Sequence, residues 1–465
     1  MPPTPSTTRR SPPLPAQFHG RAPELDFLNE LHDSNRPELF VLYGRRRVGK
    51  TELLQRFCAG RRAVYFLAAQ VRDRDNLRAF RHAIAESLGD QLANDVEFPD
   101  WSSALSFLAE RANGERLVVV LDEFPYLCES NKSVPSQIQR FWDTRGKHAS
   151  LMLVLCGSQV SFMEKEVLAE RSPLFGRRTA QRRLEPLAPL QTLAFFERWS
   201  LSERVLAYSI LGGMPAYLQR FDDSISLREN LLRDVLRPEG FLFDEVQFLL
   251  RSELSNPATY NSILAAVARG AQKLNDIALE VGVDSTTANK YLTTLRELRL
   301  VERDVPLTDP DPLRSRRGTY RIADRFLQFH FRHLQPHLSL IHAGRGAKVL
   351  EQFIEPDMPR LADEAAVEFV LDHLRREAAE LVGDELPDVG RYNGRYVRAV
   401  ARTSKGSGVA AIILPNEKLA TAALALELEA LRPAFGDKLI KLTYGLTDRA
   451  DRPLEVERVP DGELV

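Results

Sequence analysis

The sequence predicts an α/β fold with a parallel sheet at its centre, and two observations support this prediction. Short apolar segments of strand length recur in the first third of the chain, and the richest are LVVVL at 117–121 and LMLVL at 151–155. Segments with apolar residues at helical spacing separate them. Continuous apolar strands that alternate with helices are typical of a parallel sheet covered on both faces.

The elements of this first region can be placed in order along the chain. We expect strands at 37–44, 62–68, 117–121 and 151–155. We expect helices at 24–33, 50–58, 74–88, 101–112 and 134–145. The first of these strands ends in glycine and is followed by a loop and the helix KTELLQRFC.

The remainder of the chain changes character. Helices are expected from 188 to 254, with breaks at LGGMP and RPEG, and residues 256–322 indicate three short helices and two strands. The predicted domains are a disordered Pro-rich tail (1–17), an α/β core (18–187), a helical domain (188–254), a helix–turn–helix domain (255–338) and a small α/β domain (339–465).

Charge and composition exclude several classes of protein. The chain has 63 Lys and Arg against 64 Asp and Glu, so a globally basic nucleic-acid binder is not indicated. Its three scattered cysteines, Cys58, Cys128 and Cys156, argue against a disulfide framework or a zinc site. No run approaches the roughly 18 apolar residues of a membrane span, and the Pro-rich start has no signal-peptide core. We therefore expect a cytoplasmic protein.

Residues 44–51, GRRRVGKT, match the phosphate-loop pattern G-x-x-x-x-G-K-[ST]. The glycines let successive backbone N–H groups point into one concavity, to which the following helix adds its positive N-terminal end. Lys50 is expected to reach the β- and γ-phosphates, and Thr51 to offer its hydroxyl to Mg²⁺. The predicted nucleotide-binding residues are Gly44, Arg45, Arg46, Arg47, Val48, Gly49, Lys50, Thr51 and Glu52. The expected cofactors are ATP and Mg²⁺.

Two acids follow the apolar strand at 117–121. A carboxylate at the end of a buried strand is where a nucleotide-bound Mg²⁺ needs a ligand, and Asp122 has that place. Glu123 can orient or deprotonate the attacking water. An alternative is that both residues merely end the strand at the surface. The strand LMLVLCGSQ also ends in polar residues. We expect Ser158 to sense the γ-phosphate, and Gln159 is the second candidate for this role.

Several further segments resemble one family. They are FHGRAPEL (18–25), YGRRRVGKTELL (43–54), VVVLDEFPYL (118–127), CGSQVSFME (156–164), PLFGRRT (173–179), LGGMPAYL (211–218) and FLFDEVQFLLRSEL (241–254). Together they resemble the archaeal-type ATPases of the STAND class of P-loop NTPases, from about residue 18 to 335. The resemblance implies a five-stranded core of the additional-strand type, a helical lid, a winged helix and the action of an ATP-driven switch.

The resemblance also implies roles for individual residues. Gly20-Arg21 resembles the segment that packs near the nucleotide base, and Pro215 resembles the lid residue that couples nucleotide state to the winged helix. Arg177 or Arg178 resembles the arginine that contacts the γ-phosphate, from the same subunit or a neighbour. The alternative for Arg177 and Arg178 is that they are solvated surface charges, and the alternative for the segment GGMP is a simple helix break. Arg45–Arg47 are expected to face outward.

Residues 256–322 indicate a winged helix without help from the family. Thr286, Thr287, Asn289 and Lys290 would then face the major groove of DNA, and a wing with Arg314, Arg316 and Arg317 would lie along phosphates. Ten Lys and Arg against eight Asp and Glu give this segment a weak electrostatic footprint. Packing against the core or against a protein is the alternative.

The last region resembles a restriction-endonuclease-like domain that has lost its metal site. Glu368 has the place of the first acid, but there is no Asp or Glu between Arg391 and Arg402, and VAAIILP lacks the Glu-x-Lys pair. Without converging carboxylates no metal can be held. We therefore expect Glu368 to be a surface helix residue, and the domain to bind a protein or a second copy of the chain.

These observations leave three functions open. The leading one is an ATP-hydrolysing switch that acts on duplex DNA or on a protein partner. A transcription regulator that uses nucleotide only as a ligand, with little hydrolysis, is the alternative, and an ATPase-powered nuclease is the third.

Overall fold

The computed structural model describes residues 18–90, 95–112, 114–254, 256–309, 311, 314–315, 317–413, 420–436, 439–446 and 454–460. The predicted Pro-rich tail, residues 1–17, lies outside them. The chain forms two compact units, Met1–Glu185 and Pro186–Val465. The first unit ends two residues before the predicted end of the α/β core at 187.

The first unit contains a five-stranded sheet in the order β2-β3-β4-β1-β5, in which every neighbouring pair is parallel. Its strands are β1 (Glu38–Tyr43), β2 (Ala63–Leu67), β3 (Leu117–Asp122), β4 (Leu151–Gly157) and β5 (Ala180–Arg183). The three central strands β3, β4 and β1 are buried along their whole length. The predicted parallel α/β fold is therefore confirmed.

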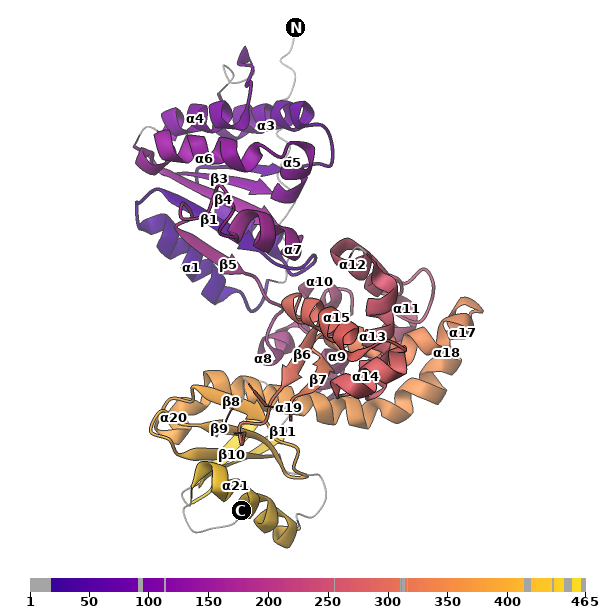
Figure 1. The fold of residues 1–465 in the computed structure, drawn as a ribbon. Helices are drawn as coiled ribbons and strands as arrows, with labels where there is room; N and C mark the ends of the chain where they lie inside the picture. The colour runs from indigo at the N-terminus through magenta and orange to yellow at the C-terminus, as the bar shows by residue number, and fades with distance from the viewer. Residues whose placement is uncertain are drawn as a thin grey trace. The chain divides into compact units, whose positions relative to one another are not determined.

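Helices cover both faces of this sheet. They are α1 (Ala22–Asp33), α2 (Lys50–Cys58), α3 (Asp73–Leu88), α4 (Trp101–Ala112), α5 (Phe124–Ser130), α6 (Val134–Thr144) and the short α7 (Val160–Phe162). Figure 1 shows α3, α4, α5 and α6 together on one side of the sheet and α1, which packs on α2, on the other. Apolar faces of these helices bury large side chains such as Phe57, Phe80, Trp101 and Phe141. Burial of each side chain of this size contributes about 1.5–3 kcal/mol.

The second unit begins with short helices. They are α8 (Pro189–Thr192), α9 (Leu201–Leu211), α10 (Pro215–Leu218), α11 (Leu227–Asp234) and α12 (Glu245–Glu253). Ser200 and Glu203 form a capping box at the start of α9, and Ser226 and Glu229 form another at α11. Because such caps satisfy free N–H groups at a helix start, they fix where these helices begin.

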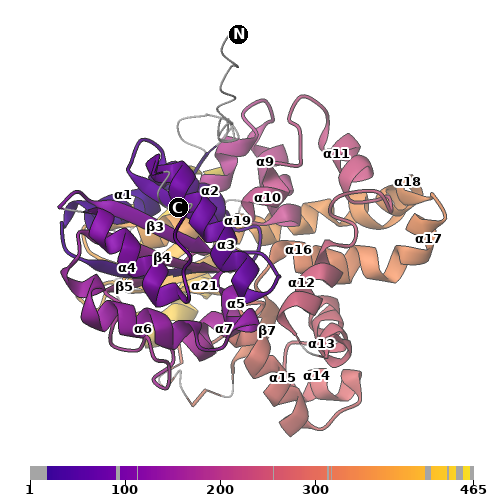
Figure 2. The ribbon, with the colours of Figure 1, turned by 90° about the horizontal axis from the view of Figure 1, so that it is seen from above.

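Three helices and a hairpin follow. They are α13 (Pro257–Arg269), α14 (Leu274–Val281), α15 (Ser285–Glu297) and the antiparallel strands β6 (Val301–Asp304) and β7 (Thr319–Ile322). Gly270 and Gly282 end α13 and α14 in the left-handed conformation that glycine tolerates best, and Asp284 caps α15. This is the helix–turn–helix with wing that the sequence predicts, and Figure 2 shows its helices grouped together.

A helical hairpin leads into the last domain. Its helices are α16 (Arg325–Phe329), α17 (Leu338–His342), α18 (Gly346–Val349) and α19 (Met358–Arg376), with π-helical turns at His330–Leu334 and Leu350–Ile354. The helix α19 packs on α9 and also on β8 and β9. It therefore joins the helical domain to the last domain.

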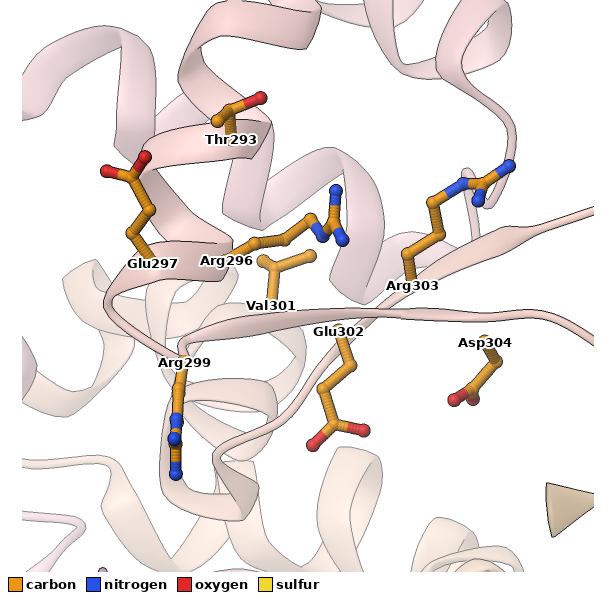
Figure 3. A pocket seen from close by; sticks show the side chains of 8 residues that line it. All are labelled: Thr293, Arg296, Glu297, Arg299, Val301, Glu302, Arg303 and Asp304. Atoms are coloured by element: carbon orange, nitrogen blue, oxygen red, sulfur yellow. The ribbon is translucent and has the colours of Figure 1, made fainter. Parts of the chain in front are cut away.

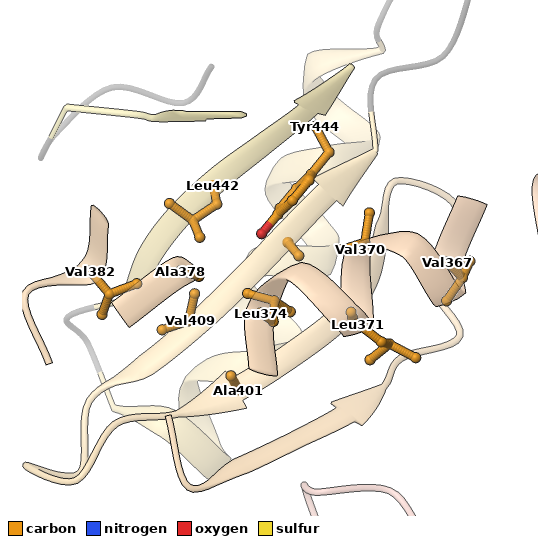
Figure 4. Close-up of a cluster of buried hydrophobic side chains, with 12 residues drawn as sticks. Val367, Val370, Leu371, Leu374, Ala378, Val382, Ala401, Val409, Leu442 and Tyr444 are labelled. Carbon is orange, nitrogen blue, oxygen red and sulfur yellow. The ribbon is translucent and has the colours of Figure 1, made fainter. Parts of the chain in front are cut away.

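The last domain has a mixed sheet in the order β12-β11-β10-β9-β8. Its elements are α20 (Ala378–Val382), β8 (Asp388–Arg391), β9 (Val397–Arg402), β10 (Gly408–Ile413), α21 (Thr421–Phe435), β11 (Leu439–Leu446) and β12 (Leu454–Arg458). Figure 4 shows Val370 and Leu374 of α19 beside Val409 and Leu442 of the sheet, within one buried cluster. In the described part of the chain, no helix combines the length and the apolar character that a membrane crossing needs.

Candidate nucleotide-binding site

The phosphate loop and the residues Asp122, Glu123 and Ser158 converge at one edge of the sheet in the first unit. In a parallel sheet all strands end at the same edge, and β4 lies between β3 and β1. The loop after β1, the acids after β3 and Ser158 after β4 therefore come together. The amide N–H of Gly44 donates to the carbonyl of Gly157 at 3.3 Å, which ties the loop to the end of β4.

The loop at 44–49 curls tightly and needs its glycines. Gly49 has a φ of +93°, and a Cβ on Gly44 would lie 2.4 Å from the carbonyl oxygen of Leu184. No other residue fits at Gly44 without moving the backbone. The helix α2 begins at Lys50, directly after Gly49, so its free N–H groups and positive end face the loop.

Lys50 lies in the loop and is only 5% exposed. Its Nζ donates to the carbonyl oxygens of Gly44 at 2.8 Å and Arg45 at 3.0 Å. These contacts hold the ammonium group within the concavity that the loop forms. The position fits the predicted role of a cation for the phosphates.

The sequence predicts that the arginines of the loop all face outward, and the structure differs from this prediction. Arg46 is exposed, and its Nη2 donates to the hydroxyl of Tyr126 at 2.7 Å. Arg45, in contrast, is only 6% exposed, so the prediction is wrong for this residue. The reason is the curl of the loop, which turns neighbouring side chains to opposite sides. Arg47, with a φ of +68°, and Glu52, in the first turn of α2, are half-buried.

Arg21 is buried and holds the loop through hydrogen bonds to backbone carbonyl groups. The side chain is 5% exposed, and its Nη2 donates to the carbonyl oxygens of Val48 at 2.9 Å and Glu185 at 2.8 Å. Burial lowers the pKa of this guanidinium, which the nearby Glu24 partly offsets. The family resemblance placed Gly20-Arg21 near the base, whereas these contacts join Arg21 to the loop backbone. The base contact stays a prediction.

Asp122 lies at the end of β3 and accepts three hydrogen bonds. Its Oδ2 accepts from Thr51 Oγ1 at 2.8 Å and from the Tyr65 hydroxyl at 2.5 Å, and its Oδ1 accepts from the Glu123 N–H at 2.9 Å. Sequence reasoning did not find Tyr65, because nothing in RAVYFLA distinguishes it from a core aromatic residue.

The pair Thr51 and Asp122 fits a magnesium ion. Mg²⁺ prefers oxygen ligands, takes few of them from the protein, and completes its shell with phosphates and water. A hydroxyl and a carboxylate lie side by side here, at the start of the phosphate-binding helix. Among the described residues no three His, Cys, Asp or Glu side chains converge as a metal cluster, and such a cluster is not needed for a nucleotide-bound ion.

Glu123 has an unusual backbone that points its side chain along the edge. Its φ of +52° is in the left-handed region, which costs a non-glycine residue about 1–2 kcal/mol. Its Oε2 accepts a hydrogen bond from Ser158 Oγ at 2.7 Å, and Ser158 is 1% exposed. The side chain of Gln159 donates instead to Glu129 at 2.9 Å. Ser158 is therefore the polar residue of β4 that reaches Glu123.

Arg177 and Arg178 do not lie at this edge. They precede β5, whose Ala180 pairs with Phe40, so they lie beside the start of β1, about 20 Å from the loop at ~3.3 Å per residue. Arg177 makes a forked contact with Asp143 at 2.9–3.0 Å, and Arg178 donates to the Leu168 carbonyl at 3.1 Å. The structure therefore does not support the same-subunit role. Contact with a neighbouring subunit stays a prediction.

Pro215 begins α10 in the second unit and is buried. The preceding Gly213 is closely packed, because a Cβ there would lie 1.9 Å from the carbonyl oxygen of Leu187. The hydroxyl of Tyr217 donates to Glu245 at 2.9 Å. The segment LGGMP is thus a packed junction within the helical domain. Its coupling to nucleotide stays a prediction.

The first turns of α15 expose most of the predicted DNA contacts. Thr286, Asn289 and Lys290 are exposed, and the buried Ala288 faces the core. Thr287 is half-buried, and its hydroxyl donates at 2.6 Å to Asp284, the residue that caps the helix. The predicted contact Arg316 lies outside the described residues.

A hollow of about 570 Å³ lies between the end of α15 and β6. Figure 3 shows the side chains that line it: Thr293, Arg296, Glu297, Arg299, Val301, Glu302, Arg303 and Asp304. Three cations and three carboxylates share its lining, and Arg321 pairs with Glu302 at 2.5 Å and with Asp304 at 2.7 Å. The hollow therefore has no net charge that would select one class of ligand.

Glu368 is not a surface residue, and this prediction is wrong. Its side chain is 12% exposed and lies 2.6 Å from Arg325, 2.8 Å from Arg391 and 3.4 Å from Arg321. The hydroxyl of Tyr208 donates to its second oxygen at 2.6 Å. The reason is that α19 packs on α9 and β8, so that this face of the helix is covered. Glu368 joins elements from three of the predicted domains.

The fold and the site together define a P-loop ATPase domain that is followed by a winged helix–turn–helix module. A family model for an ATPase domain predominantly from Archaea matches residues 18–221, and a model for the IclR helix-turn-helix domain matches residues 262–305. An uncharacterized protein of Methanocaldococcus jannaschii is 34% identical over 329 residues, which are 70% of this chain and 71% of that protein. The chain therefore belongs to the family of ATPases found predominantly in Archaea.

Two further similarities agree with this assignment. An uncharacterized ATP-binding protein of the same organism is 50% identical over 40 residues, which are 9% of this chain and 68% of that protein. The structure of a Walker-type ATPase of Pyrococcus abyssi covers 68% of this chain and 96% of its own, with a TM-score of 0.51 and 20% identity. The second similarity shows the fold alone. The predicted resemblance to the archaeal-type ATPases is confirmed.

Proposed function

We propose that this protein is an ATP-hydrolysing switch of the STAND type, which couples its nucleotide state to the winged helix. The observation that carries the proposal is the row of contacts at the sheet edge, where Thr51 meets Asp122 and Ser158 meets Glu123. A nucleotide-binding site needs only the first pair. A residue that is placed to act on water, with its own hydrogen-bonded partner, favours hydrolysis.

Each residue of the site has a defined task in this proposal. Lys50 and the backbone N–H groups of the loop bind the phosphates, and Thr51 and Asp122 hold Mg²⁺. When bound, Mg²⁺ neutralises charge on the β- and γ-phosphates. Glu123 orients the attacking water and accepts its proton, and Ser158 fixes the direction of the Glu123 carboxylate.

The output of the switch is proposed to be DNA or protein binding by the second unit. The exposed first turns of α15 support a DNA contact, and the tight junction at Gly213 supports transmission of movement through the helical domain. Turnover is expected to be slow without a partner, because many switch NTPases await an arginine from another chain. Arg177 and Arg178 are the candidates for that arginine in a neighbouring subunit.

The test is phosphate release and ATP binding by Lys50→Ala, with Lys132→Ala as the matched control on an exposed loop. Lys50→Ala should lose both activities, because the phosphates lose their dedicated protein cation. The control should retain them. Equal ATP affinity in Lys50→Ala and the wild type would refute the site. ATP binding without turnover by the wild type, with or without duplex DNA, would favour the nucleotide-liganded regulator instead.

A further inference from the structure

Tyr65 brings a second hydroxyl to the carboxylate of Asp122. The strands β2 and β3 pair with Tyr65 opposite Val120 and Leu67 opposite Asp122. Because residues two apart on a strand share a face, Tyr65 and Asp122 lie on the same face, one step apart. The hydroxyl of Tyr65 donates to Oδ2 of Asp122 at 2.5 Å, and this oxygen also accepts from Thr51 at 2.8 Å.

The two hydroxyls that donate to Oδ2 would have different roles once a nucleotide and its cation are bound. Thr51 is the residue whose hydroxyl the P-loop pattern assigns to the cation, so its oxygen must serve that ion. Tyr65 lies on a strand and has no such second task. It is therefore the side chain that can keep Asp122 oriented both before and after the cation binds. The third donor, the Glu123 N–H, contacts the other oxygen at 2.9 Å.

We propose that Tyr65 is a positioning residue for the cation site: its hydroxyl fixes the Asp122 carboxylate in the orientation that holds Mg²⁺ beside the nucleotide. This inference rests on the proposed nucleotide site and adds the residue that sets its affinity for the divalent cation. Partners that orient a metal ligand from behind typically change metal affinity by about 10–100-fold when they are removed. Tyr65 is not a catalytic residue, since it acts only through Asp122.

The test is Tyr65→Phe, which removes the hydroxyl and keeps the ring between the neighbouring side chains. Binding of a fluorescent, non-hydrolysable ATP analogue is titrated with Mg²⁺, so the readout does not depend on turnover. The Mg²⁺ concentration that gives half-maximal binding should rise about tenfold or more. Binding of the same analogue in EDTA should stay unchanged, because the loop and Lys50 are intact. Binding of Mn²⁺, obtained from the paramagnetic resonance signal of the free ion, should weaken in the same way.

Tyr444→Phe is the control. It removes a buried hydroxyl in the second unit, which lies 3.1 Å from His373, and should leave the Mg²⁺ requirement unchanged. Tyr65→Phe with the Mg²⁺ requirement of the wild type, or with a lower one, would overturn the role of Tyr65 and leave the nucleotide site standing. A wild type that binds no analogue, with Mg²⁺ or in EDTA, would overturn the nucleotide site and this inference together.

Discussion

The carboxylate of Glu368 lies 2.6 Å from the guanidinium of Arg325 inside the second unit. Arg325 begins α16, 43 residues before Glu368 on α19, and is 5% exposed. Two further arginines, Arg321 on β7 and Arg391 on β8, contact the same carboxylate. One acidic side chain thus compensates charge from the wing, the hairpin and the last sheet.

Replacing this carboxylate should destabilise the second unit. Glu368→Gln keeps the shape but removes the carboxylate that Arg325, Arg321 and Arg391 share, and breaking a buried ion pair typically costs about 3–5 kcal/mol. Because Arg321 keeps Glu302 and Asp304, and Arg325 keeps Glu364, we expect a loss at the lower end of this range. The measurement is calorimetric unfolding of the full chain. Glu377→Gln, at the first residue after α19, is the control. Its side chain is 61% exposed, so the substitution should change the free energy of unfolding by about 0.5 kcal/mol or less. Equal melting of Glu368→Gln and the wild type would mean that the network contributes nothing.

The same network predicts a pH dependence. Burial would raise the pKa of Glu368, but Arg325, Arg321 and Arg391 outweigh it and lower the pKa to about 2. The pKa of a glutamate in the unfolded chain is about 4.3. The stabilisation by the Glu368 charge is therefore complete above about pH 5 and is lost as the pH falls toward 2. This lowering of the Glu368 pKa corresponds to about 3 kcal/mol of folding stability at neutral pH.

The measurement for this pH dependence is the stability gap between the wild type and Glu368→Gln as a function of pH. The gap should be constant from neutral pH to about pH 5 and should shrink below it. A gap that stays the same down to about pH 2.5 would contradict the assignment of the titration to Glu368.

The contact between Ser158 and Glu123 predicts how hydrolysis depends on each residue. Glu123→Gln should retain ATP binding and slow phosphate release by roughly 10²–10⁴-fold, the usual contribution of a general base. Ser158→Ala should slow it less, because the carboxylate remains but loses its 2.7 Å hydrogen bond. Single-turnover phosphate release measures both. Gln159→Ala, whose side chain contacts Glu129, is the matched control on the neighbouring residue. Unchanged turnover in Glu123→Gln would mean that another group orients the water.

Much of the first unit could be predicted from the sequence because its signals are local. The central strands are continuous apolar runs, and the helix predicted at 50–58 is α2 with the same bounds. The strand β5 was implied only by the family resemblance. Its residues AQRR are mostly polar, because an edge strand pairs on one side only and is only partly buried.

Other features depend on residues that are far apart in the sequence. Arg21 contacts Val48 and Glu185, and Glu368 contacts arginines at 321, 325 and 391. No spacing rule connects such positions, so the sequence predicts a lone Glu on a helix to be a surface residue. The burial of Arg45 cannot be predicted for a related reason, since the direction of a side chain in a curled loop follows from its dihedral angles and not from its residue type.

The exposed start of α15 gives the last prediction, which concerns DNA. If Lys290 contacts a phosphate, Lys290→Ala should weaken duplex binding and reduce the slope of log affinity against log salt by about 0.9. The reason is that each phosphate neutralised by a lysine releases condensed counterions from the duplex. Lys348→Ala, an exposed lysine on α18, is the control and should leave the slope unchanged. Fluorescence anisotropy of a labelled duplex at several salt concentrations measures both variants. A wild type without salt-sensitive DNA binding would make the winged helix a protein-interaction module, in which case Lys290→Ala should be tested for its effect on self-association instead.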